Sequence, residues 1–286
     1  MRVAYLGPAG TNTHDALLAA AGGAELDAVP CATVHEAIAA VEGGDAERGF
    51  VPFENSIEGA VRSTLDTLAF EAGSVTIAGE HDHRIHHALI AGRELELSAI
   101  GQVISHEQAG AQCARFLRES LPGVAVRPES STAEAVRIVA SSDEPWAAIG
   151  PPAAAKLYGA VVLRDEIGDE DDNVTRFVWI APSGARPGGG GPWRTTLIFS
   201  ELGADHPGAL VDALTEFSSR AVNLTRLESR PLRRELGRYM FFVDIEGSDS
   251  QPAVADAIDA LRGKAENVRV LGSYPVNAGG VPGTPP

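Results

Sequence analysis

The chain has 286 residues, which is long enough for two modest domains, and 44% of them are hydrophobic, enough to fill both cores. The formal net charge of −16 argues against nucleic-acid binding, because that binding needs a basic face that neutralises phosphates. It does not exclude an anionic substrate, since salt screens distant charges and the donors inside a cleft determine affinity.

Compartment is indicated by the cysteines and by the absence of long apolar runs. Cys31 and Cys113 lie far apart in the sequence without metal-ligand spacing, which predicts two reduced thiols. The first residues lack an apolar signal core, and no apolar segment approaches the roughly 20 residues that span a bilayer. We therefore expect a cytoplasmic protein without membrane contacts.

Two runs of predicted elements resemble each other. Residues 3–6 form an apolar strand that leads through a Gly/Pro turn to a helix near Thr11, and residues 103–104 form a strand followed by a helix from about Gln108. Each run continues with a capping box and a strand closed by proline; the boxes are Thr33 with Glu36 and Ser131 with Glu134. Two tandem βαβαβ units predict two α/β lobes that face each other across a cleft, with one larger doubly wound sheet as the alternative.

Three strand ends are expected to face this cleft. They cover residues 7–11, 52–56 and 105–108, and all three begin helices. Ligands of open α/β sheets bind beyond the carboxyl ends of the strands, where helix N–H groups and dipoles favour anions. The pattern therefore predicts a site for a carboxylate.

A histidine-rich segment covers residues 80–87. On a strand, His81, His83 and His87 would share one face, which raises the possibility of a metal site. Such a site also needs further ligands and a supporting shell, so we interpret the segment as a polar crossover strand between the lobes.

Residues 173–180 follow a run of four acidic residues and read as a strand. Alternation places Val174, Arg176 and Val178 on one side and Thr175, Phe177 and Trp179 on the other. An arginine among apolar residues needs an anionic partner when it is desolvated; an edge-strand arginine with its head in solvent is the alternative.

A composition break then divides the chain. We predict a catalytic domain at 1–182, with lobe one at about 1–79 and 163–182 and lobe two at about 80–162. A Gly-rich linker follows at 183–192, then a second domain at 193–276 and a flexible tail at 277–286. The second domain reads strand, helix, strand, strand, helix, strand, which is a ferredoxin-like βαββαβ plan.

Several motifs, in order, resemble those of the prephenate dehydratase family with its C-terminal ACT regulatory domain. They are the segments 7–11, 51–59, 105–109, 148–151 and 173–177, and, beyond the linker, 207–210 and 223–231. The resemblance covers nearly the whole chain. It implies a two-lobed catalytic domain of the periplasmic-binding-protein-like type II fold.

The resemblance also implies a reaction without cofactor or metal, in which prephenate loses carbon dioxide and its ring hydroxyl to give phenylpyruvate for phenylalanine biosynthesis. We expect Thr175 to contact the leaving hydroxyl, Arg176 to clamp a carboxylate and Phe177 to wall the ring. The same assignment places Glu54, Asn55 and Ser56 among the catalytic residues, and the candidate acids are Glu54, Glu58 and His106. The expected substrate-binding residues are Gly10, Thr11, Ser105, His106, Gln108 and Asn173.

Some positions depart from the family pattern, among them Asn12, Thr13, Glu107 and Gly110. Because they border the predicted cleft, they bear on substrate detail more than on the class of reaction. Alternative functions are a prephenate decarboxylase, which would alter the threonine that is intact here as Thr175, an arogenate dehydratase, and a non-enzymatic sensor.

The ACT resemblance implies feedback inhibition by phenylalanine, bound between paired domains of a homodimer or homotetramer. The residues expected to line this effector site are Gly208, Ala209, Leu210, Glu228, Ser229, Arg230 and Pro231.

Overall fold

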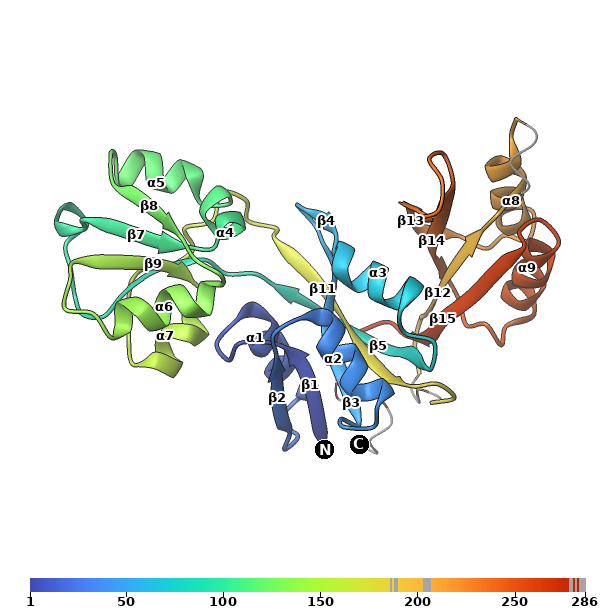
Figure 1. The fold of residues 1–286 in the computed structure, drawn as a ribbon, viewed down its shortest axis with the longest axis horizontal. Helices are drawn as coiled ribbons and strands as arrows, with labels where there is room; N and C mark the ends of the chain where they lie inside the picture. Colours follow the sequence, from blue (N-terminus) through green and yellow to red (C-terminus); the bar gives the residue numbers. More distant parts are fainter. Residues whose placement is uncertain (186, 188–189, 203–206, 278–279, 281, 283–286) are drawn as a thin grey trace.

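Three β-sheets, each with its own helices, lie in a row in the part of the chain that the structure describes (Figure 1). The structure is a computed structural model, and it describes residues 1–185, 187, 190–202, 207–277, 280 and 282. Two sheets belong to the catalytic domain, and the third belongs to the ACT domain.

Lobe one is built on a mixed sheet with the strand order β2-β1-β3-β11-β5, to which β4 adds beside β3. Its strands are β1 (Arg2–Leu6), β2 (Asp27–Cys31), β3 (Arg48–Asn55), β4 (Gly59–Ala60), β5 (Val75–Arg84) and β11 (Val174–Pro182). Its helices are α1 (Asn12–Ala21), α2 (Val34–Glu42) and α3 (Arg62–Phe70).

Lobe two has a sheet of order β10-β6-β9-β7-β8. Its strands are β6 (Ala88–Ala91), β7 (Gln102–Ser105), β8 (Ala125–Pro128), β9 (Trp146–Gly150) and β10 (Val161–Arg164). Its helices are α4 (Glu107–Ala111), α5 (Ala114–Ser120), α6 (Thr132–Ala140) and α7 (Pro152–Tyr158), with a 3-10 turn at Leu97–Ala99.

The predicted internal repeat is confirmed. The parallel triplet β2-β1-β3 of lobe one corresponds to the parallel triplet β8-β7-β9 of lobe two. Both predicted N-caps form: Thr33 accepts a hydrogen bond from the Glu36 N–H, and Ser131 accepts one from the Glu134 N–H. Because each triplet belongs to its own sheet, the alternative of one doubly wound sheet is wrong.

The crossovers between the lobes lie later in the chain than we predicted. Strand β5 stays paired with β11 as far as Arg84, so the first crossover covers residues 85–87 and not residue 80. Strand β10 pairs with β6 until Arg164, so the chain returns to lobe one through residues 165–173. The polar half of β5, which contains His81 and His83, is thus part of the central sheet of lobe one.

The ACT domain has the predicted βαββαβ plan, with the sheet order β13-β14-β12-β15. Its elements are β12 (Trp193–Ser200), α8 (Ala209–Ser218), β13 (Leu224–Pro231), β14 (Tyr239–Glu246), α9 (Pro252–Arg262) and β15 (Asn267–Pro275). Helices α8 and α9 bury one face of the sheet around Phe199, Phe217 and Leu261. Strand β13 lies at the edge of the sheet.

The other face of the ACT sheet packs on lobe one. Met240, Phe242, Leu271 and Tyr274 share a hydrophobic core with residues of α2, α3, β3 and β5. At one close approach between the domains, a Cβ atom on Gly272 would lie 2.1 Å from the backbone oxygen of Ile77. The two domains are therefore joined by a dry, close contact in addition to their covalent connection.

Parts of the predicted linker and tail lie outside the described residues, namely 186, 188 and 189 of the linker and 278, 279, 281 and 283–286 of the tail. Two described residues of the tail contact the catalytic domain. The Asn277 side chain forms hydrogen bonds with the backbone N–H and the carboxylate of Asp82, and the Pro282 carbonyl accepts a hydrogen bond from Arg48. At these two positions the expected flexible tail is held against lobe one.

Among the described residues, no helix is both long enough and apolar enough to cross a bilayer.

The close contact at Gly272 leads to a stability prediction. Gly272→Ala places a methyl group against Ile77, and overpacking of this kind costs about 1–3 kcal/mol. For a chain of this size we expect Tm in a thermal scan to fall by about 3–10 °C. Gly73→Ala is the matched control, since an added Cβ there meets no atom within 4 Å. Equal melting of the two variants would show that this contact is not tight.

Candidate active site

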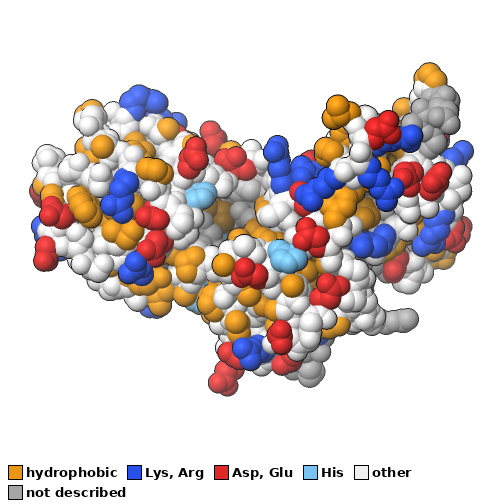
Figure 2. All heavy atoms as spheres, viewed as in Figure 1, with side chains coloured by type: hydrophobic (Ala, Val, Ile, Leu, Met, Phe, Trp, Pro, Cys, Tyr) orange, Lys and Arg blue, Asp and Glu red, His pale blue; other side chains and the backbone are white. Residues whose placement is uncertain are grey.

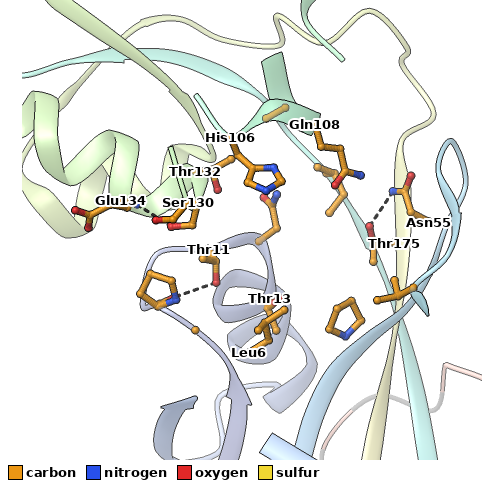
Figure 3. A pocket seen from close by; sticks show the side chains of 18 of the residues that line it. Leu6, Thr11, Thr13, Asn55, His106, Gln108, Ser130, Thr132, Glu134 and Thr175 are labelled. Atoms are coloured by element: carbon orange, nitrogen blue, oxygen red, sulfur yellow. Dashed lines mark hydrogen bonds between the residues drawn. The ribbon is translucent and has the colours of Figure 1, made fainter. Parts of the chain in front are cut away.

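A cleft of about 800 Å³ opens between the two lobes. It is lined by residues of α1, β3 and β11 from lobe one and by residues of α4, α6 and the β8–α6 loop from lobe two. Figure 2 shows the hollow between these lobes, and Figure 3 shows the side chains that reach it. The volume suits a small organic substrate.

Thr175 and Asn55 form a hydrogen-bonded pair on the lobe-one wall of this cleft (Figure 3). They are directly opposite each other on the paired strands β11 and β3. The Asn55 carbonyl oxygen accepts hydrogen bonds from the N–H groups of Ile57 and Glu58, which turns its amide nitrogen toward Thr175 at 2.9 Å. Since Asn55 donates to the Thr175 oxygen, the Thr175 hydroxyl hydrogen is left to point elsewhere.

A chain of amides continues from this pair to the crossover between the lobes. Asn55 donates to the Asn173 side-chain oxygen at 2.7 Å, and Asn173 donates to Gln112 at 2.9 Å. The same Gln112 oxygen is 2.9 Å from Nε2 of His87. Gln112 belongs to lobe two, so these hydrogen bonds fix the catalytic side of lobe one against its partner lobe.

His87 lies on the cleft wall and is 4% exposed. Because the Gln112 oxygen is an acceptor, Nε2 of His87 carries the proton and Nδ1 is an acceptor, and Nδ1 is buried without a partner. Burial lowers the pKa of His87, although the hydrogen bond to Gln112 raises it. The imidazole is therefore neutral at neutral pH.

Phe177 supplies an apolar wall. It is 1% exposed, lines the cleft, and stacks on Phe50 with 5.2 Å between ring centroids. The Phe50 ring is in turn tilted against Trp179, so the position of Phe177 is fixed by packing.

Two helices begin at the cleft, one from each lobe. Thr11 caps α1 and Ser131 caps α6, and both residues line the cleft. The helix N-termini provide N–H groups and positive dipole ends that stabilise an anion.

The described residues that line the cleft include no lysine or arginine. Its two carboxylates, Glu129 and Glu134, form ion pairs with Arg127 and Arg137 of their own lobe. The candidate groups for anion binding in this lining are therefore neutral donors, His106 and the helix N-termini.

The structure brings only some of the predicted substrate-binding residues to the cleft. Thr11, His106 and Gln108 line it. Gly10 instead packs between the lobes, where its Cβ position lies 3.1 Å from Leu157. Ser105 is buried and donates to the His106 carbonyl, and Asn173 acts through Asn55 and Gln112.

Arg176 does not face the cleft. Strand alternation turns its side chain away from Thr175 and Phe177, and its guanidinium contacts Glu54, Glu80 and Asp244. Burial lowers its pKa, but Asp244 and the other neighbours raise it by more, so the net shift is upward. Arg176, which we expected to bind a carboxylate of the substrate, thus binds three carboxylates of the protein on the opposite side of the sheet.

Two other predicted catalytic residues lie outside the cleft lining. Glu54, which alternates with Asn55, is hydrogen-bonded to Arg176 and Arg226 behind the sheet. Ser56 donates to the Asp172 carbonyl and accepts from the Val174 N–H, so it ties the end of β3 to the returning chain. Of the predicted catalytic residues, Asn55, Thr175 and Phe177 line the cleft together.

The predicted effector residues lie on two elements of the ACT domain. Gly208 precedes α8 with φ of 97°, and Ala209 and Leu210 begin that helix. Glu228, Ser229, Arg230 and Pro231 end the edge strand β13. Arg230 forms a bidentate ion pair with Asp66 of α3, so it contacts the catalytic domain in this single chain.

Sequence reasoning missed several residues of the cleft, among them His87, Gln112, Ser130 and Thr132. The repeat gave a usable signal for two of them, because Ser130 and Thr132 flank the cap that corresponds to Thr33 of lobe one. His87 was considered only as a metal ligand. Within the described residues, no group of three or more His, Cys, Asp or Glu side chains is arranged to hold a metal ion.

Fold and site together define a two-lobed, periplasmic-binding-protein-like α/β enzyme with a C-terminal ACT domain. Comparison with known proteins gives the family. The prephenate dehydratase family matches residues 3–185, and the ACT domain family matches residues 196–263. The chain belongs to the prephenate dehydratase family.

Individual relatives agree. A prephenate dehydratase from Amycolatopsis methanolica is 38% identical over 285 residues, which cover 99% of this chain and 91% of the relative. A bifunctional chorismate mutase/prephenate dehydratase from Aquifex aeolicus is 40% identical over 96% of this chain and 74% of its own. The crystal structure of the Arthrobacter aurescens prephenate dehydratase in complex with L-Phe has a TM-score of 0.88 and 39% identity, covering 99% of this chain and 92% of that chain.

The amide chain yields a kinetic prediction. Gln112→Leu removes the group that joins His87 and Asn173, so the Asn55–Thr175 pair loses its fixed orientation, and we expect kcat for prephenate to fall about 10-fold or more. Gln102→Leu is the control, because Gln102 starts β7 at the end away from the cleft. Equal steady-state kcat values for the two variants would contradict a role for the chain.

Proposed function

We propose that the cleft catalyses the decarboxylating dehydration of prephenate to phenylpyruvate, with Thr175 beside the leaving hydroxyl. The bond from the ring to its carboxylate breaks, its electron pair moves through the ring, and the C–O bond to the hydroxyl breaks. Carbon dioxide leaves, and the departing hydroxide takes up a proton that comes from solvent and can pass through the Thr175 hydroxyl, so that it leaves as water. Because the product ring is aromatic, the reaction needs little more than positioning and assistance to the leaving group.

The hydrogen-bonded pair of Thr175 and Asn55 carries this proposal. The pKa of a threonine hydroxyl is too high for a strong acid, so Thr175 acts as a hydrogen-bond donor or as a relay for a proton. Asn55 occupies an acceptor site of the Thr175 oxygen at 2.9 Å, which supports a hydroxyl hydrogen directed at the substrate.

The two helix N-termini support the binding of a dicarboxylate. Thr11 at α1 and Ser131 at α6 belong to different lobes, so a substrate with two carboxylates can engage both. We assign the pyruvyl carboxylate to one of these helix starts in place of Arg176. Neutral donors hold the ring carboxylate without stabilising it as strongly as an arginine would, which suits a group that has to leave.

Substitution of the threonine tests the proposal. Thr175→Ala removes the donor, and we expect kcat for prephenate to fall by about 100-fold or more, with a much smaller change in KM. Thr175→Ser keeps the hydroxyl and is expected to retain more activity than the alanine variant. Absorbance and mass of the product measure the rate, and full kcat in Thr175→Ala would refute the assignment.

The same assay separates the remaining alternatives for the wild-type chain. Phenylpyruvate is the expected product, whereas a non-aromatic dihydro acid would indicate decarboxylation alone. Arogenate, run in parallel, measures substrate preference. The two unpaired thiols, Cys31 and Cys113, support a reducing compartment, and we place the enzyme in the cytoplasm.

Phenylalanine is the proposed effector, bound between paired ACT domains of a homodimer or homotetramer. Support comes from the ACT fold, from the edge strand β13 and from the L-Phe complex of the Arthrobacter aurescens enzyme. The unpaired edge of β13 gives a second copy a strand to pair with, and its exposed side chains include Leu227 at 44% exposure.

Calorimetry on the full chain tests the effector site. We expect saturable phenylalanine binding that Gly208→Val weakens at least 10-fold, because a branched side chain is strained at a φ of 97° beside the start of α8. Gly44→Val is the matched control, with φ of 80° in the catalytic domain. Identical affinities in both variants would place the effector elsewhere.

A further inference from the structure

Six alternating charges lie behind the catalytic pair, where lobe one meets the ACT domain. We name them the interdomain ion cluster: Glu54, Glu80 and Arg176 from lobe one, and Arg194, Arg226 and Asp244 from the ACT domain. The arginines and carboxylates are equal in number, so the cluster is neutral when all are ionised. Each of its carboxylates contacts an arginine of the opposite domain.

Arg176 is the centre of the cluster. One of its nitrogens is 2.6 Å from Asp244 and 2.8 Å from Glu54, and the other is 3.6 Å from Glu80. The guanidinium also lies over the Phe53 ring, 4.9 Å from the centroid, and Arg226 lies at 5.0 Å from the same centroid. Each of these contacts restricts where the Arg176 side chain can go.

The pair of Arg176 and Asp244 is dry and well held. The side chains are 8% and 0% exposed, so the attraction between them is screened little by water or salt. The second Asp244 oxygen accepts a hydrogen bond from Thr196 at 2.7 Å, and Thr196 is hydrogen-bonded to Tyr274. Asp244 therefore moves with the core of the ACT sheet.

Strand register connects this cluster to the cleft. Arg176 pairs with Glu54 across β11 and β3, and the next pair along the same strands is Thr175 with Asn55. The peptide backbone is shared between neighbours, so a shift of Arg176 or Glu54 tilts the adjacent catalytic side chains. A hydrogen bond to a leaving group is sensitive to displacements of this size.

The other end of the connection reaches the predicted effector residues. Asp244 lies on β14, which pairs directly with the edge strand β13 that contains Ser229 and Arg230. A ligand that changes the packing of β13 therefore acts on the strand that holds Asp244. The physical link is continuous from β13 through β14 to β11.

We propose that Arg176 is a positioning residue, through which the ACT domain sets the alignment of Thr175 and Asn55 and by which the effector lowers activity. This inference rests on the proposed function of the cleft and of the ACT domain. Phenylalanine inhibits, on this account, because it favours an arrangement of the ACT sheet in which the contact between Asp244 and Arg176 is broken or shifted.

Asp244→Asn tests the proposal on the full-length chain. The substitution keeps the size and the acceptor for Thr196 but removes the charge that holds Arg176. We expect kcat for prephenate to fall about 10-fold while KM changes less than about 3-fold, since alignment at the reacting hydroxyl is lost and the binding groups are untouched. Calorimetry is expected to show that phenylalanine binds more tightly than to the wild type, because the contact that opposes the phenylalanine-bound arrangement is already lost, and most of the inhibition at saturating phenylalanine is expected to disappear.

Thr76→Val is the matched control. It removes an interdomain hydrogen bond, from Thr76 to the Leu271 carbonyl, that lies outside the cluster. We expect kcat and inhibition by phenylalanine to remain as in the wild type. Equal loss of inhibition in Thr76→Val and Asp244→Asn would assign the coupling to the domain contact as a whole and overturn the proposal.

Two further results keep the test decisive. If Asp244→Asn does not fold, Arg176→Lys keeps the positive charge but loses the planar fork, and it is expected to show the same loss of kcat and of inhibition. Wild-type kinetics in either variant overturns the proposal. If the wild-type chain makes no phenylpyruvate, the proposed function of the cleft is refuted. If phenylalanine does not inhibit the wild-type chain, the proposed regulatory role of Arg176 is refuted. The changes in kcat and KM of the variants still decide whether Arg176 positions Thr175 and Asn55.

Discussion

The two-residue period of one buried strand governs the whole arrangement. Strand β11 lies between β3 and β5 in the lobe-one sheet, and residues on both of its faces are buried. Thr175 and Phe177 point into the cleft, and Arg176 between them points to the ACT domain. Under the proposed roles, catalysis and regulation therefore depend on three consecutive residues of one strand.

The described part of the cleft wall lacks the lysine and arginine side chains that sites for anionic substrates commonly contain. A chain with a net charge of −16 presents no arginine or lysine among the described residues of the cleft wall. Several arginines lie instead at the junction with the ACT domain, where Arg226, Arg230 and Arg233 form ion pairs with Glu54 and Asp66. Under the proposed function, helix starts and amides from the two lobes hold the substrate in a fixed geometry.

Much of the fold could be predicted because local signals repeat. The two capping boxes and the two proline-closed strands gave the tandem lobes, and the second domain was readable from its βαββαβ pattern. The crossover positions were missed because the polar half of β5 looks like a loop in sequence, while its backbone pairs with β11 as far as Arg84. Pairing partners distant in sequence set that boundary.

The site was predictable in part for a similar reason. Alternation on β11 separated Arg176 from Thr175, but the sequence offers no means of knowing that Asp244, 68 residues later, would lie behind the strand. Without knowledge of Asp244, a carboxylate of the substrate was the natural partner to predict for Arg176. His87 and Gln112 were missed because each becomes significant only through a hydrogen bond to the other across the crossover.

The placement of one helix start in each lobe has a consequence for turnover. Thr11 and Ser131 lie on opposite walls, and the lobes are joined by the two crossovers at 85–87 and 165–173. Under the proposed assignment, prephenate with its two carboxylates would link the two walls, whereas phenylpyruvate has one carboxylate and would engage only one of them. The departure of carbon dioxide would then remove the charge that bridges the lobes, so the chemical step itself would favour product release.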